Sequence, residues 1–187
     1  MVYQPAEDSY LLEKEVKSLI SKLKNKELDK IKVLDMGSGS GIQAQASIKS
    51  GIKMSNVLCV DIDEEVIDFL KKQKLQAVQS NLFSNIKDKF NLIIFNAPYL
   101  PEDKDEKKYG KVLDTTAGKK GFEIIIKFLE QAKQHLNKEG KILLLFSNLS
   151  KPRVILKEAK QLGYKYKKLA EQKLFFEKLF VYEFLVD

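Results

Sequence analysis

Short apolar runs alternate along this chain with longer segments whose apolar residues recur every three or four positions. The first long segment extends from about Glu7 to Lys24. Leu12, Val16 and Leu19 fall on one face of it at helical spacing, so a helix is predicted there. Further helices are expected at residues 41–51, 63–73, 121–136 and 151–163, and strands at 31–37, 56–61, 75–80, 90–96, 140–148, 165–176 and 178–186.

This order of elements predicts an α/β fold. Strands that alternate with helices are typical of a doubly wound, mainly parallel sheet with helices on both faces, here with seven strands. The last two runs flank a short connection at Glu177 and Lys178, which indicates a C-terminal antiparallel hairpin at the edge of the sheet. With 187 residues, the chain is expected to form one domain over residues 1–187.

The charge suggests nucleic acid at first, and its make-up argues against this. The net charge is +7, but 32 of the 33 basic residues are lysines and Arg153 is the only arginine. Arginine makes the common bidentate contacts to guanine, so a solvated lysine surface is the better interpretation, although an acidic or RNA-bound partner stays open. The sequence has no apolar run of about 20 residues and no secretory signal, and Cys59 is its only cysteine. A cytoplasmic protein is expected.

A glycine turn follows the first predicted strand. The sequence LDMGSGSG puts Gly37, Gly39 and Gly41 at the turn into the next helix, where they permit tight turning and close approach of a ligand. Asp61 ends the second strand, about 20 residues further on, where an acid can accept hydrogen bonds from a ribose diol. This context predicts a cofactor that contains a nucleoside.

Asp35 distinguishes between the cofactors that this turn could bind. The loop reads G-x-G-x-G rather than the dinucleotide pattern G-x-G-x-x-G, and an acid precedes it by two residues. A pyrophosphate would require a helix N-terminus free of negative charge. S-adenosylmethionine carries no phosphate, and its amino group and sulfonium are cationic. The sequence therefore predicts S-adenosylmethionine, with Asp35 at the mouth of the turn facing these groups.

The tetrapeptide NAPY follows the fourth predicted strand, beside the first strand in this topology. A planar amide or amino group is a poor nucleophile, so its two N–H groups need acceptors that hold it in place. The Asn96 side-chain oxygen can accept one and the Ala97 carbonyl the other. Pro98 biases Ala97 to an extended conformation, and Tyr99 can lie against the planar group. Positioning of this kind needs neither a metal nor a covalent nucleophile.

These motifs resemble those of a known family. NAPY is similar to the N/D-P-P-Y motif of methyltransferases that act on amide or exocyclic nitrogens. VYQPAEDSYLL together with DMGSGSG resembles the HemK-like protein-glutamine N5-methyltransferases of the archaeal and eukaryotic type, over nearly the whole chain. The resemblance implies that the substrate is the glutamine of the GGQ loop of a class I translation termination factor.

The resemblance also implies roles for individual residues. Ser9, Asp35, Gly37, Asp61, Asn81 and Leu82 would contact S-adenosylmethionine, and Asn96 and Tyr99 would hold the glutamine. Asn81 replaces the usual Asp of an Asp-Leu pair that meets the adenine, which keeps an acceptor oxygen and loses a charge. Ala97 replaces the first proline of the motif, so we expect slower positioning without a change of chemistry.

Relatives of this type resemble each other in needing a small zinc-binding activator subunit. It pairs with the edge of the sheet near the third strand, LQAVQS in this chain, and an apolar edge strand calls for such a cover. The complex would be a heterodimer. The chain itself offers no metal site, and its single histidine, His135, is expected at the surface of a helix.

Two other functions remain open from the sequence. An N6-adenine or other nucleic-acid methyltransferase would use the same tetrapeptide on an exocyclic amine, but it would need a basic groove and usually a recognition domain. A non-catalytic cofactor-binding protein would instead tolerate the loss of Asn96.

Overall fold

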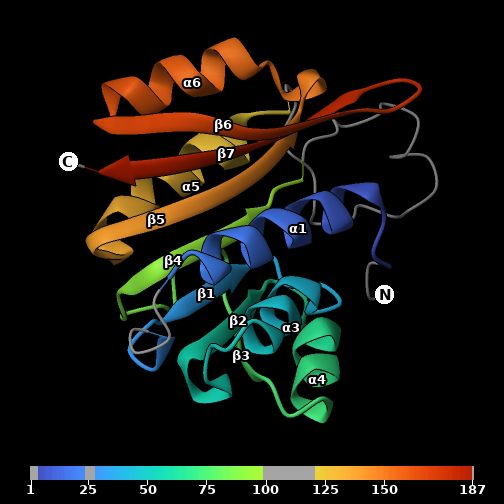
Figure 1. The fold of residues 1–187 in the computed structure, drawn as a ribbon, viewed down its shortest axis with the longest axis vertical. Helices are drawn as coiled ribbons and strands as arrows, with labels where there is room; N and C mark the ends of the chain where they lie inside the picture. Colours follow the sequence, from blue (N-terminus) through green and yellow to red (C-terminus); the bar gives the residue numbers. More distant parts are fainter. Residues whose placement is uncertain (1–3, 24–27, 99–120, 187) are drawn as a thin grey trace.

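A computed structural model describes residues 4–23, 28–98 and 121–186. Its strands form one seven-stranded sheet in the order β3-β2-β1-β4-β5-β7-β6 (Figure 1). The neighbours from β3 to β5 are parallel, and β7 is antiparallel to both β5 and β6. The strand bounds are β1 Val33–Met36, β2 Val57–Asp61, β3 Gln76–Gln79, β4 Phe90–Asn96, β5 Leu136–Ser147, β6 Tyr164–Lys173 and β7 Lys178–Val186. The predicted fold class and the C-terminal hairpin are confirmed.

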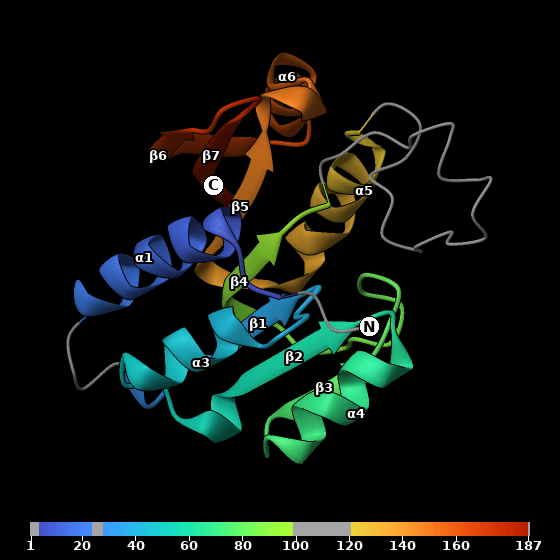
Figure 2. The same cartoon turned by 90° about the vertical axis from the view of Figure 1, so that its right-hand side faces the viewer.

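Helices cover both faces of the sheet, and each face has its own hydrophobic core. The helices α1 (Glu7–Ser21), α3 (Ile42–Lys49) and α4 (Glu64–Lys72) contribute to one core, and α5 (Glu123–Ala132) and α6 (Pro152–Gln161) to the other (Figure 2). Three short 3-10 helices complete the described elements: η1 Met54–Asn56, η3 Lys133–His135 and η4 Asn148–Ser150. No helix among the described residues is long and apolar enough to cross a membrane.

The chain reverses direction across the sheet between β3 and β4. After β3 at one edge, β4 returns to the far side of β1, with Met36 level with Phe95. Such a switch point leaves a crevice at the carboxyl ends of the strands, which is where open α/β sheets bind ligands. The glycine turn, Asp61 and Asn96 all follow or end strands at this edge.

Several predicted boundaries differ from the structure. The first helix ends at Ser21 rather than Lys24, since no glycine or proline marks its end in the sequence. The helix predicted to reach residue 136 stops at Ala132, and β5 starts at Leu136, four residues before the predicted 140. The segment Asn137–Gly140 lies opposite a single β4 residue and includes Glu139 at φ 62°, so the register of the two strands shifts here. Because this segment is polar, the sequence pattern did not predict it as part of the strand.

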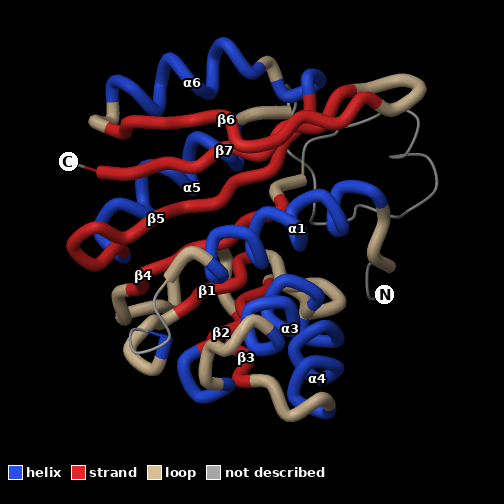
Figure 3. Tube along the Cα trace, in the orientation of Figure 1, coloured by secondary structure: helices blue, strands red, loops and turns tan. Residues whose placement is uncertain are grey.

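The C-terminal hairpin turns earlier than the sequence predicts. Phe175 and Phe176 count as strand formers, yet they form the tip, and Leu174 N donates to Glu177 O at 2.8 Å to close the turn (Figure 3). Their side chains are 93% and 88% exposed. The tip projects beyond the carboxyl end of β5, on the same side of the sheet as the carboxyl end of the parallel strand β4.

Candidate functional site

The glycine turn has the backbone geometry that only glycine adopts easily. Gly37, Gly39 and Gly41 have φ values of 60°, 50° and 77°. A Cβ on Gly37 would lie 3.3 Å from Phe95 Cε2, so the turn also packs tightly against β4. Ser38 connects the turn to two strands. Its N–H donates to Val60 O of β2 at 3.0 Å, and its hydroxyl donates to Asp35 O of β1 at 2.6 Å. The turn is therefore held in a shape that brings main-chain groups toward a ligand.

Asp61 lies beside this turn, as predicted. Its Oδ2 accepts from Gly39 N at 3.0 Å and its Oδ1 accepts from Asp63 N at 3.1 Å. Each carboxylate oxygen can accept further bonds, so the same acid can serve the hydroxyls of a ribose. Asp61 thus fixes the turn and offers acceptors at the end of β2.

Asp35 lies beneath the turn rather than at its mouth, because it is still part of β1. The residue is 1% exposed, and its Oδ2 accepts from Ala44 N at the start of α3, at 3.1 Å. Burial, with a smaller contribution from the charge of Asp61, raises the pKa of the Asp35 carboxyl well above its ordinary 3.8. No described lysine or arginine forms an ion pair with Asp35 or Asp61. Asp61 is partly accessible and forms no ion pair with a described residue, so it is the acid of the two that fits a cationic ligand.

Asn96 ends β4 at the same edge of the sheet. Its Nδ2 donates to Asp8 Oδ2 at 3.0 Å, across 88 positions of sequence. Its Oδ1 is buried and accepts no hydrogen bond from the described residues. A buried acceptor without a donor costs about 1–3 kcal/mol, so such an atom in a folded protein calls for an explanation.

The sequence did not identify Asp8 and Gln43 as residues of the site. Asp8 is 5% exposed and bonds Asn96, whereas the resemblance had pointed only to its neighbour Ser9. Gln43 Nε2 donates to Ser9 O at 2.9 Å, which ties the start of α1 to α3. Gln43 Oε1 is a second buried acceptor with no partner among the described residues. The two adjacent acids in PAEDS, Glu7 and Asp8, were the only signal in the sequence, since Gln43 belongs to an ordinary helical pattern.

Asn81 and Leu82 lie next to Asp61, because Ser80 N donates to Asp61 O at 2.8 Å. Leu82 has a φ of 51°, which is unusual for a residue other than glycine, and Ser80 Oγ donates to its carbonyl at 2.8 Å. The Leu82 side chain is buried in the core, while Asn81 is exposed. Residues held in such backbone conformations cluster at functional sites.

The remaining residues of the tetrapeptide differ in what the structure describes. Ala97 is buried, and its N–H donates to Leu145 O at 3.3 Å, a bond that the proline of the family motif could not make. Pro98 is half-buried. Tyr99 lies outside the described residues, so its predicted role stays a prediction.

The other polar side chains considered from the sequence form no metal site. No group of three potential ligands lies together in the described part of the chain. His135 belongs to the 3-10 helix η3 rather than to a regular helix, is half-buried and stacks on Phe83 at 4.5 Å between ring centroids. Burial raises the pKa of the Cys59 thiol, so this residue stays a neutral part of the core.

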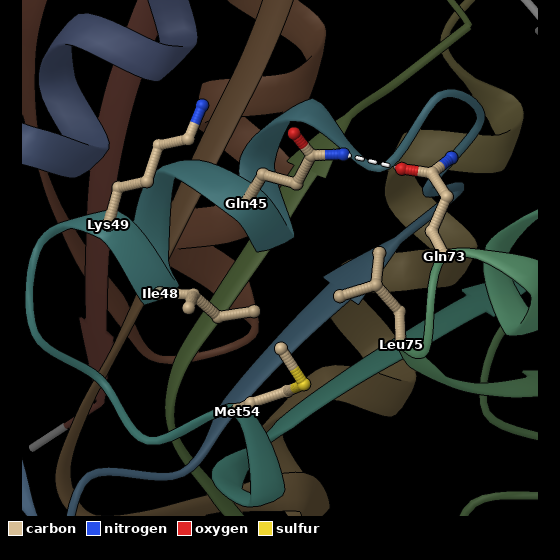
Figure 4. Close-up of a pocket in the computed structure, with 6 residues that line it drawn as sticks. All are labelled: Gln45, Ile48, Lys49, Met54, Gln73 and Leu75. Carbon is tan, nitrogen blue, oxygen red and sulfur yellow. Dashed lines mark hydrogen bonds between the residues drawn. The ribbon is translucent and has the colours of Figure 1, made fainter.

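A hollow lies near the amino ends of β2 and β3 (Figure 4). It opens near the end of α3 and the starts of β2 and β3, and a bond from Gln45 Nε2 to Gln73 Oε1 of 2.6 Å spans one side. Its lining is Gln45, Ile48, Lys49, Met54, Gln73 and Leu75. The hollow is separate from the candidate site, because Met54 and Leu75 precede β2 and β3, whereas Asp61 and Asn96 lie at the carboxyl ends of β2 and β4.

Comparison with known proteins identifies the family of this chain. The family described as "Methyltransferase small domain" matches residues 12–175. This chain is a member of that family. A Methanocaldococcus jannaschii methyltransferase named "Putative protein N5-glutamine methyltransferase" is 37% identical over 96% of this chain and 89% of its own. The human methyltransferase HEMK2 is 28% identical over 87% of this methyltransferase and 79% of its own chain.

Solved structures share the fold. This methyltransferase superposes on a structure of the E. cuniculi Mtq2–Trm112 complex, responsible for methylation of the eRF1 termination factor, with a TM-score of 0.76. The match covers 100% of this chain and 99% of that one at 21% identity. The predicted resemblance to HemK-like methyltransferases and the predicted class of enzyme are confirmed.

Proposed function

We propose that this methyltransferase modifies the side-chain amide nitrogen of a protein glutamine, and that its substrate is the GGQ-loop glutamine of a class I translation termination factor. The observation that carries the proposal is Asn96 Oδ1, the buried acceptor that no described residue satisfies. An amide N–H of the substrate is the donor that this oxygen lacks. The name of the M. jannaschii relative supports a protein glutamine as the substrate, and the Mtq2–Trm112 complex, responsible for methylation of eRF1, supports a termination factor.

The residues at the carboxyl edge fit S-adenosylmethionine. Asp61 would accept from the ribose hydroxyls, and the glycine turn would pass close to the amino-acid part, with the buried Asp35 supporting the turn from beneath through its bond with Ala44 N. Ser9, Asn81 and Leu82 stay proposed contacts. When bound, S-adenosylmethionine supplies an electrophilic methyl group.

The protein's contribution to the reaction is positioning. Asn96 Oδ1 and the Ala97 carbonyl would each accept one N–H of the glutamine, which fixes the nitrogen with one face free. Methyl transfer would break the sulfur–methyl bond, form the nitrogen–methyl bond and release one N–H proton to solvent, and the oxygens that accept the N–H groups would stabilise the positive charge that develops on the nitrogen. Pro98 and Tyr99 would limit how the amide group can rotate.

We also propose a small zinc-binding activator as a partner in a heterodimer. The exposed edge strand β3 supports this, because one side of its backbone has no neighbouring strand in the described sheet. The strand is less apolar than predicted, since Gln76 and Gln79 are exposed and only Ala77 and Val78 are half-buried. The structure of the Mtq2–Trm112 complex supports a partner of this kind. The predicted cytoplasmic location stays a prediction.

The decisive experiment is methyl transfer to a purified termination factor, to the same factor with its GGQ glutamine changed to alanine, and to DNA and tRNA. Labelled methyl on the intact factor alone supports the proposal, and labelling of nucleic acid alone would contradict it and indicate a nucleic-acid methyltransferase.

We expect Asn96→Ala to keep its affinity for S-adenosylmethionine and to lose most turnover. Asp61→Ala should instead weaken cofactor binding by about 1.5–3 kcal/mol, the scale of a hydrogen bond to a charged group. Equal cofactor loss in both variants would contradict this division of roles.

A further inference from the structure

The Asn96 carboxamide has a fixed direction in the structure. An amide can present either its oxygen or its NH2 group to a given side, and the two orientations have almost the same shape. A carboxylate, however, only accepts hydrogen bonds. Because Asp8 Oδ2 lies 3.0 Å from the Asn96 side chain, the NH2 group must face Asp8 and Oδ1 must face away from it.

Asp8 is itself held firmly. Its Oδ1 accepts from Ser9 N at 2.6 Å and lies 3.2 Å from Ser9 Oγ, within the first turn of α1. Ser9 O accepts from Gln43 Nε2 at 2.9 Å, which joins α1 to the second residue of α3. The next residue, Ala44, donates to Asp35 at 3.1 Å. The carboxylate that orients Asn96 is thus connected, bond by bond, to the strand that leads into the glycine turn.

We propose that Asp8 is a positioning residue, which sets the orientation of the Asn96 amide so that its oxygen is left for the substrate. The inference rests on the proposed function of Asn96 as the acceptor for a substrate N–H. With the amide reversed, the Asn96 NH2 group would face the substrate NH2 group. Two donors cannot form a hydrogen bond, so the substrate amide nitrogen would keep only one of its two hydrogen-bond acceptors.

The test is Asp8→Asn, which keeps the shape of the side chain but can donate as well as accept. The Asn96 amide then has two acceptable orientations. We expect kcat on the protein substrate to fall by about 10- to 100-fold, the range for losing a hydrogen bond that involves a charged group. The affinity for S-adenosylmethionine and the midpoint of thermal unfolding should stay close to those of the unmodified protein.

The matched control is Glu7→Gln, in the same first turn of α1. It removes the same charge at the same helix N-terminus, but Glu7 is exposed. We expect no change in kcat, so a general effect of charge on the helix is separated from the effect on Asn96. If Asp8→Asn does not fold, Asp8→Glu keeps the charge and displaces the carboxylate by one methylene, and the same loss of kcat is expected.

A second measurement does not depend on activity. The side-chain 15N–1H2 resonances of Asn96 can be assigned by their absence in Asn96→Ala, and they should shift in Asp8→Asn and not in Glu7→Gln. A kcat within twofold of the unmodified protein, or unshifted Asn96 resonances in Asp8→Asn, overturns the role of Asp8. If the unmodified protein methylates no glutamine, the proposed function fails, while the resonances still decide whether Asp8 orients Asn96.

Discussion

Single residues set the geometry of the cofactor side of the site. Gly37 combines a positive φ with a close approach to Phe95, whose ring packs on Phe128 at 4.6 Å between centroids. The sequence pattern was sufficient to place Gly37, Gly39 and Gly41 in a turn and Asp61 at the end of a strand, because each occupies a fixed position relative to a strand end. Asp8 could not be predicted in this way. Its partner is 88 positions away, and only the folded sheet brings the two together.

We predict that Gly37→Ala lowers both stability and cofactor affinity. The left-handed backbone costs an L-residue roughly 1–2 kcal/mol, and the added Cβ would press on the packed Phe95 ring. Gly163→Ala is the matched control: its φ is 87°, and its added Cβ would meet the flexible end of Lys133 at 3.3 Å. Chemical unfolding and calorimetric titration with S-adenosylmethionine measure the two effects. Undiminished cofactor affinity in Gly37→Ala would show that the ligand does not depend on this turn.

At the level of elements, the sequence predicts the order of helices and strands well and some of their ends poorly. The run Phe90–Asn96 is observed with the predicted bounds, because its four central residues, Leu92 to Phe95, are apolar and are buried in the cores on the two faces of the sheet. The start of β5 and the hairpin tip were misjudged. In both places the chain contradicts local preference: polar residues 137–140 belong to a strand, and two phenylalanines form a turn.

The two edge strands of the sheet, β3 and β6, are expected to differ in whether they pair with a partner subunit. We expect an activator subunit to protect the backbone amides of β3 from hydrogen exchange, since pairing would use its free edge. The opposite edge strand β6 serves as an internal control. The backbone amides of its exposed lysines at positions 165, 167 and 168 should exchange hydrogen at the same rate with and without the partner. Exchange mass spectrometry of the free and bound chain measures both. Protection confined to β6 would place the partner at the wrong edge.

For the molecule as a whole, Asp35 links folding to pH. Its pKa is raised in the folded state, so the folded chain keeps this proton to a higher pH than the unfolded chain does. The resulting stabilisation is complete below the ordinary 3.8 and is lost as pH rises through the raised value.

We therefore predict that Asp35→Asn removes one contribution to the pH dependence of stability. As pH rises from the ordinary 3.8 toward the raised pKa, the unmodified protein should lose stability relative to this variant by up to about 1.4 kcal/mol per pH unit, the value for one proton. Urea unfolding at a series of pH values gives the difference, with the exposed Asp68→Asn as the control. Parallel curves for the protein and Asp35→Asn would mean that this carboxyl ionises alike in both states.

The unsatisfied oxygen of Asn96 also bears on selectivity. Glutamine and glutamate have nearly the same size and shape, so a pocket can hardly separate them by fit. Under the proposed function, a glutamate carboxylate would bring a negative oxygen against Asn96 Oδ1, where only a donor is welcome. A target protein whose glutamine has deamidated to glutamate would then not be methylated, and no methyl donor would be consumed.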